Sequence, residues 1–257
     1  MSNALAIAHK ELKSYFASPI AYFVIGFSAF LFGYFYVVLL LNFDRVSLQA
    51  GSGFGGGPDT VNVNQMLIAP LFMNVSVILL FVLPLLTMRT YSEEKRSGTI
   101  ELLLTSPLTD LQIVMGKFLG ALALYAAMLG VTVVHLAFLF VFGNPEWRPV
   151  LTGYLGLLLM GGSLLSLGLF VSSTTKNQIV AGVITFALTL LLWISNWIAS
   201  FLSQPMQGAL NYLSITEHLN DFTIGVLDTK HLIYYVSFIA FNLFLTVRSV
   251  DTERWRG

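Results

Sequence analysis

Charged residues are scarce in this chain, and cysteine is absent. Only 10% of the 257 residues are Asp, Glu, Lys or Arg, less than half of the usual fraction in a soluble domain. The 13 basic and 13 acidic residues cancel, so the net charge gives no indication of a nucleic-acid partner. The lack of cysteine excludes disulfides and thiolate metal sites.

Long apolar runs take the place of charge. Hydrophobic residues make up 56% of the chain, and the mean hydropathy is +0.79. A helix needs roughly 20 apolar residues to cross about 30 Å of hydrocarbon. We therefore predict an all-α fold, a polytopic membrane protein whose six transmembrane helices occupy residues 19–257. The six apolar runs lie at about residues 20–41, 68–88, 115–142, 151–172, 179–202 and 232–247, and the last is short.

The basic residues predict the orientation of the helices. With the N-terminus inside, ten of the 13 basic residues fall on the cytoplasmic side and three fall outside. This bias follows the positive-inside rule, so both termini are predicted to be cytoplasmic. The ten are Lys10, Lys13, Arg89, Lys95, Arg96, Lys117, Lys176, Arg248, Arg254 and Arg256, and the three are Arg45, Arg148 and Lys230.

Residues 1–18 predict an amphipathic helix at the cytoplasmic interface. Leu5, Leu12 and Phe16 share one helical face, whereas Lys10 and Lys13 lie on another. Such a helix lies along the membrane surface with its apolar side inward. A basic flank that only sets the topology is the alternative, and the two interpretations are compatible.

A segment rich in charge of both signs, RTYSEEKRSG at residues 89–98, separates the second apolar run from the third. The sequence that follows predicts a short helix over about residues 98–105, because its leucines favour a helix and Pro107 prevents continuation. Thr109 and Gln112 then form a capping-box pattern that starts the next helix. Such a segment suits contact with a soluble partner. The alternative, that its charges only solvate a helix end, fits the residues equally well.

The glycine-rich stretch GSGFGGGPD, residues 51–59, is interpreted as a flexible outer loop. No Lys-Ser/Thr pair follows it, and the loop is predicted to lie outside the cell. A phosphate-binding function is therefore excluded for this stretch.

The predicted spans contain few ionisable residues and no recognisable catalytic motif. No acidic or basic residue lies at the middle of a span, which disfavours proton relays and ion-coupled carriers. His135, Asn74 and Asn196 are interpreted first as interhelical hydrogen-bonding groups and second as lining of a pathway. The sequence has no His-Glu-x-x-His run, and the order of His135 and Ser163 does not fit an intramembrane serine protease.

Two histidines, His218 and His231, lie in the third outer region with Glu217, Asp221 and Asp228. These side chains can bind metals, but their spacing matches no ligand pattern. We interpret them as solvated polar faces of short outer helices and predict no metal site.

The stretch YSEEKRSGTIELLLTSPLTDLQIVMGKFLG, residues 91–120, resembles the signature of ABC-2 type permeases, the membrane subunits of ABC transporters. It stands in the matching loop, between the second and third of six spans. Residues 212–238 are most similar to the gliding-motility-associated subgroup of that family. The residues that match the signature are Glu94, Gly98, Thr99, Glu101, Leu103, Pro107, Gly116 and Lys117.

The resemblance implies an exporter of the bacterial inner membrane, built from two permease copies, as a homodimer or with a paralogue, above two ABC ATPase subunits. The helix over residues 98–105 would be the coupling helix that docks on the ATPase. ATP and Mg²⁺ would bind in that partner, because this sequence lacks Gly-x-x-x-x-Gly-Lys-Ser/Thr. The chain itself is predicted to bind no cofactor, metal or nucleic acid and to be no enzyme, with the lipid bilayer as its surroundings.

The residues predicted to contact the ATPase come from three segments: the amphipathic helix, the charged loop with the coupling helix, and the turn after the fourth span. They are Lys10, Lys13, Glu93, Glu94, Lys95, Arg96, Gly98, Thr99, Glu101, Leu102, Leu103, Pro107 and Lys176. A membrane scaffold or assembly factor that binds a cytoplasmic partner and transports nothing is the alternative function.

Overall fold

The computed structural model describes residues 2–51 and 62–254, which are helical with short connections and contain no strand. The glycine-rich stretch 51–59 falls, apart from its first residue, outside the described residues. The helices are α1 (Ser2–Ala17), α2 (Pro19–Gly51), a short π-helix η1 (Asn64–Ile68), α3 (Ala69–Thr87), α4 (Ser92–Ser97), α5 (Thr99–Leu104), α6 (Asp110–Phe142), α7 (Trp147–Thr174), α8 (Gln178–Ala199), α9 (Gln204–Leu213), α10 (Ile215–Thr223) and α11 (Thr229–Arg254).

Six helical segments are long and apolar enough to cross a membrane, which confirms the predicted fold class. The sixth extends beyond the predicted 232–247 at both ends, because polar residues continue a helix after the apolar run stops. The fifth ends at Ala199, three residues before its predicted end. The spans are Pro19–Ala50, Asn64–Ser97, Asp110–Phe142, Trp147–Thr174, Gln178–Ala199 and Thr229–Glu253.

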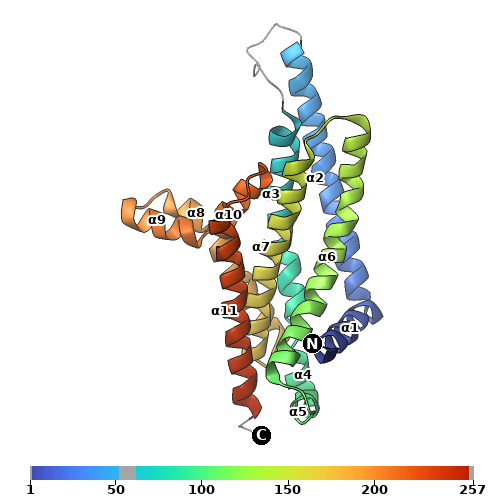
Figure 1. Cartoon of the computed structure of the whole chain (residues 1–257), viewed down its shortest axis with the longest axis vertical. Helices are drawn as coiled ribbons and strands as arrows, with labels where there is room; N and C mark the ends of the chain where they lie inside the picture. Colours follow the sequence, from blue (N-terminus) through green and yellow to red (C-terminus); the bar gives the residue numbers. More distant parts are fainter. Residues whose placement is uncertain (1, 52–61, 255–257) are drawn as a thin grey trace.

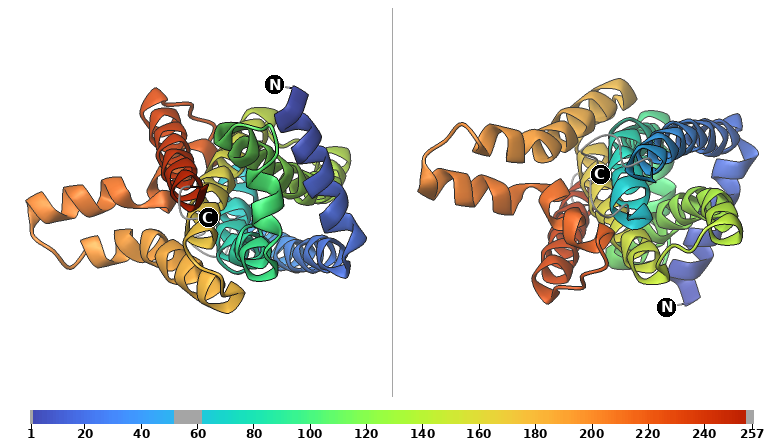
Figure 2. Two further views of the ribbon diagram at one scale, coloured as in Figure 1. Left: turned by 90° about the horizontal axis from the view of Figure 1, so that it is seen from below. Right: turned by 90° about the horizontal axis from the view of Figure 1, so that it is seen from above.

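α7 forms the centre of the bundle. In its most apolar stretch, 78% of the residues are buried, against 17% in the α2 stretch. α7 packs against α3, α6, α10 and α11, and α2 packs on the outer side of α3 and α6 (Figure 1). α8 begins against α3 and α7, and its C-terminal part extends sideways from the bundle and pairs with α9 (Figure 2). The described N-terminal and C-terminal residues lie at the same end of the molecule, next to α4 and α5 (Figure 1).

α1 packs across α6 at this end, and two glycines of α6 allow the close approach. A Cβ atom at Gly116 would lie 2.6 Å from Cβ of Ile7, and one at Gly120 would lie 2.8 Å from Cβ of Glu11. Side chains at either position would push α1 away. The Gly-x-x-x-Gly spacing therefore serves helix packing, and the helix that it contacts is α1.

Candidate functional site

A buried lysine joins the elements at the end that carries both termini. Lys117 of α6 is 1% exposed, and its Nζ donates to Oε1 of Glu94 at 2.7 Å and to Oε1 of Glu11 at 3.0 Å. Nζ also donates to the backbone oxygen of Thr90 at 3.1 Å. α1, α4 and α6 are thus connected through one ammonium group, which we call the Lys117 cluster. Separating a buried ion from its partners is strongly destabilising. Movement of α1, α4 or α6 away from the others would break these contacts, so the cluster holds the three helices together.

A serine of α7 fixes the turn between α3 and α4. Oγ of Ser172 accepts from the backbone N–H groups of Tyr91 and Ser92 at 3.1 and 3.2 Å, and it donates to the backbone oxygen of Met88 at 3.2 Å. Its two lone pairs and its single proton are therefore all used. α4 is also linked to α11, because Nζ of Lys95 lies 2.7 Å from Oε1 of Glu253.

Ser172→Ala should lower the free energy of unfolding by about 1–3 kcal/mol, because two buried N–H groups lose their acceptor. Ser166→Ala is the matched control, since Ser166 is equally buried but its hydroxyl donates only within α7, to the backbone oxygen of Ser163. Thermal unfolding in detergent measures both. Equal losses in the two variants would show that Ser172 does not hold the turn.

Much of α5 is exposed at this end of the molecule. Gly98 separates it from α4 with a left-handed backbone conformation (φ 72°), which glycine adopts without strain. Leu102 is 74% exposed, and Glu101 beside it is also exposed, whereas Ile100 faces the protein.

The predicted capping box at the start of α6 is confirmed, because the side chains of Thr109 and Gln112 each accept from the other residue's backbone N–H.

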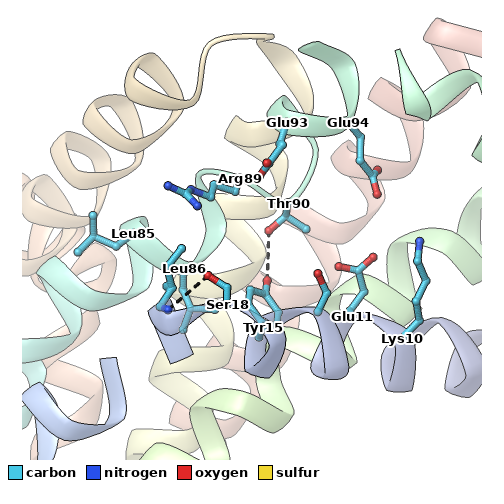
Figure 3. Close-up of a pocket in the computed structure, with 12 residues that line it drawn as sticks. Lys10, Glu11, Tyr15, Ser18, Leu85, Leu86, Arg89, Thr90, Glu93 and Glu94 are labelled. Carbon is cyan, nitrogen blue, oxygen red and sulfur yellow. Dashed lines mark hydrogen bonds between the residues drawn. The ribbon is translucent and has the colours of Figure 1, made fainter. Parts of the chain in front are cut away.

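A cavity of about 330 Å³ lies between α1 and the junction of α3 with α4 (Figure 3). Lys10 lines it from α1, and Arg89 and Glu93 line it from the other side. Tyr15 also lines the cavity, with its hydroxyl oxygen 3.5 Å from Oγ1 of Thr90. Burial raises the pKa of Tyr15 to about 12. Charged groups from α1 and α4 therefore face one shared space at this end of the molecule.

Most of the predicted contact residues are accessible. Glu94 and Lys95 are the main exceptions: Glu94 is half-buried on Lys117 and Lys95 is buried on Glu253, so the structure places both charges in ion pairs within the chain. Leu103 is half-buried. The exposed residues are Lys10, Lys13, Glu93, Arg96, Gly98, Thr99, Glu101, Leu102, Pro107 and Lys176, the last in the turn between α7 and α8.

The polar residues predicted in the spans lie away from this end. The His135 ring packs 5.4 Å from the ring of Phe32 in α2, and its buried Nδ1 has no hydrogen-bond partner among the described residues. Asn196 donates to Oε2 of Glu217 at 3.0 Å, and Asn74 is half-buried on α3.

The interpretation of His218 and His231 as solvated polar faces is wrong. His218 is 3% exposed and His231 is 5% exposed, because α10 packs against α7 beside the start of α11, which brings the two rings together. Desolvation by burial lowers the pKa of His218 below its usual value.

Sequence reasoning missed four polar groups that complete this end: Glu11, Thr90, Ser172 and Glu253. A signal for one pairing was present, because Lys117 lies only two residues inside the third apolar run and needs an acidic partner there. The identity of that partner depends on tertiary structure, since Glu11 is 106 residues away in the chain.

These features define a multi-pass membrane protein with a structured, charged face at the end that carries both termini. Residues 41–216 match the family model described as ABC-2 family transporter protein. The match covers more than half of the chain, so the chain belongs to the ABC-2 transporter family.

Two curated relatives are similar to part of the chain. Both are described as probable multidrug ABC transporter permease YbhR, one from Escherichia coli strain K12 and one from Escherichia coli O157:H7. Each is 28% identical over 142 residues, which is 54% of this chain and 38% of the relative. The match thus spans well under half of the relatives' length.

Proposed function

We propose that this chain is the membrane-spanning subunit of an ATP-driven ABC exporter and that α5 docks on a separate ATPase subunit. The observation that supports this most directly is the exposed leucine of α5. Leu102 is 74% exposed beside the charged Glu101, in a part of the chain that is anchored by buried ion pairs. An apolar side chain with a charged rim is typical of an interface core.

The connections of α5 explain how movement of the partner would reach the membrane. α5 continues through α4 into α3 on one side, and through residues 105–109 into α6 on the other. A displacement of α5 therefore acts on the second and third spans together. The Lys117 cluster joins α1 to the same unit, so in this proposal the exposed Lys10 and Lys13 of α1 would contribute to the contact.

ATP and Mg²⁺ belong to the partner in this proposal, because this sequence contains no phosphate-binding loop. The end with α4 and α5 then faces the cytoplasm of a bacterium, in agreement with the excess of basic residues there. Two copies of the permease would enclose the pathway between them. Membership of the gliding-motility-associated subgroup, which rests on residues 212–238, stays a prediction.

Charge reversal on the exposed surface tests the docking. The variant with Glu93→Arg and Glu101→Arg should lose co-purification of an ATPase subunit from native membranes, because both side chains are exposed and two charge reversals disturb the electrostatic complementarity of an interface. Glu94 is unsuitable for this purpose, since its reversal would place a second cation beside Lys117.

Asp44→Arg is the control, because Asp44 is exposed on α2 at the opposite end. Its co-purification should equal that of the unmodified protein. Undiminished co-purification of the ATPase with the double variant would contradict the proposed docking. Recovery of partners without ATPase activity would favour the scaffold function instead.

A further inference from the structure

Four polar residues of α9, α10 and α11 form a chain of hydrogen bonds at the end of α11 opposite the C-terminus. Nε2 of His218 lies 2.9 Å from the backbone oxygen of Tyr212, and Nδ1 of His218 lies 2.6 Å from Nδ1 of His231. Nε2 of His231 lies 2.8 Å from Oδ2 of Asp221. Both rings are buried, so water has little access to the ring nitrogens.

The directions of these hydrogen bonds determine where a positive charge is needed. A backbone oxygen only accepts, so Nε2 of His218 carries its proton and Nδ1 of that neutral ring accepts. His231 must then donate from Nδ1, which leaves a lone pair on Nε2 of the neutral ring. That lone pair faces a carboxylate oxygen of Asp221, which is also an acceptor. A cation between Nε2 and Oδ2 is required, and either a proton or a metal ion satisfies it.

A second carboxylate and a lysine identify this as a position for a cation with more than one ligand. Donor atoms of Asp221, Asp228 and His231 all lie within 4.8 Å of one another. Nζ of Lys230 lies 3.1 Å from Oδ2 of Asp228 and 3.9 Å from Oδ2 of Asp221, so an ammonium group now neutralises the carboxylates. The Lys230 side chain is 59% exposed and can move away without being replaced by protein.

We propose that Asp221, Asp228 and His231 form a binding site for one divalent cation of the Zn²⁺ class. One imidazole nitrogen and two carboxylate oxygens are a donor set that Zn²⁺ accepts, with water as the fourth ligand. His218 acts outside the ligand set: it accepts from Nδ1 of His231 and so orients that ring. Binding displaces the Lys230 ammonium group and the proton on Nε2 of His231. The bound ion joins α10 to the start of α11.

Zn²⁺ titration of the intact, tag-free protein in detergent tests this site by calorimetry. We expect one ion per chain. His231→Gln and Asp221→Asn should each weaken binding by more than about tenfold, because the first removes the imidazole nitrogen and the second replaces an anionic carboxylate by a neutral amide. Lys230→Gln should bind Zn²⁺ more tightly than the unmodified protein, because it removes the competing cation and leaves all three ligands in place.

The lysine variant keeps the test informative if the ligand variants fold poorly. His9→Gln is the control, since His9 is exposed on α1 at the other end, and its Zn²⁺ affinity should be unchanged. Absence of stoichiometric binding by both the unmodified protein and Lys230→Gln would overturn the proposal. Binding that Asp221→Asn leaves unchanged in a folded protein would overturn it as well.

Discussion

Lys117→Met should lower the free energy of unfolding by about 3–5 kcal/mol, because it leaves two carboxylates near each other without a buried cation. Glu11 is 13% exposed and Glu94 is 20% exposed in the ion pairs, so solvent screens them little. The protein is heated in detergent, and the remaining monodisperse fraction is measured by size-exclusion chromatography. Lys117→Met should lose this fraction at a lower temperature than the unmodified protein. Lys10→Met is the control, because Lys10 is exposed and its replacement should change stability by less than about 0.5 kcal/mol.

A triple variant distinguishes the effect of losing the lysine side chain from the effect of leaving its two carboxylate partners without a cation. Lys117→Met combined with Glu11→Gln and Glu94→Gln leaves no ion in the Lys117 cluster, so most of the stability should return. Lys117→Met with the stability of the unmodified protein would contradict the structural function assigned to the Lys117 cluster.

Leu102→Asp should weaken binding of the ATPase subunit by about 30-fold, which corresponds to about 2 kcal/mol for a residue at the centre of an interface. Because Leu102 is 74% exposed, the change removes almost no packing within the chain, and the fold should be unaffected. The measurement is the affinity of the purified ATPase subunit for the permease in lipid nanodiscs, with unfolding temperature recorded in parallel.

Two variants complete that experiment. Leu102→Met keeps an apolar side chain of similar volume and should retain most of the affinity. Leu213→Asp introduces the same charge at an exposed leucine of α9, away from α5, and should leave the affinity unchanged. Equal affinities for Leu102→Asp and the unmodified protein would mean that α5 is not the docking element.

Local signals in the sequence predicted a large part of this fold. The spans follow from apolar runs, since crossing hydrocarbon demands about 20 such residues whatever the neighbouring helices are. The start of α6 follows from Thr109 and Gln112, whose capping contacts need only three residues of separation. The end of α5 follows from Pro107, which prevents continuation of the helix.

Contacts between distant residues could not be predicted in this way. Lys95 is bound to Glu253, 158 residues away, and no local pattern links the two. Glu94 matches the family signature and was therefore predicted to contact the partner, yet its carboxylate lies on Lys117. The burial of His218 and His231 depends on how α10 packs against α7 and the start of α11. The spacing of two histidines 13 residues apart does not predict this packing.

Site-specific cross-linking at residue 102 tests the central claim that α5 contacts a separate ATPase. The chain has no cysteine, so L102C introduces a unique thiol without further changes. V141C is the control, because Val141 is equally exposed on α6 at the opposite end. With a membrane-permeant thiol-to-amine cross-linker in intact cells, L102C should form an adduct with a nucleotide-hydrolysing subunit, and V141C should not. An L102C protein that yields no such adduct, or that reacts with a membrane-impermeant thiol reagent added outside the cells, would contradict the account.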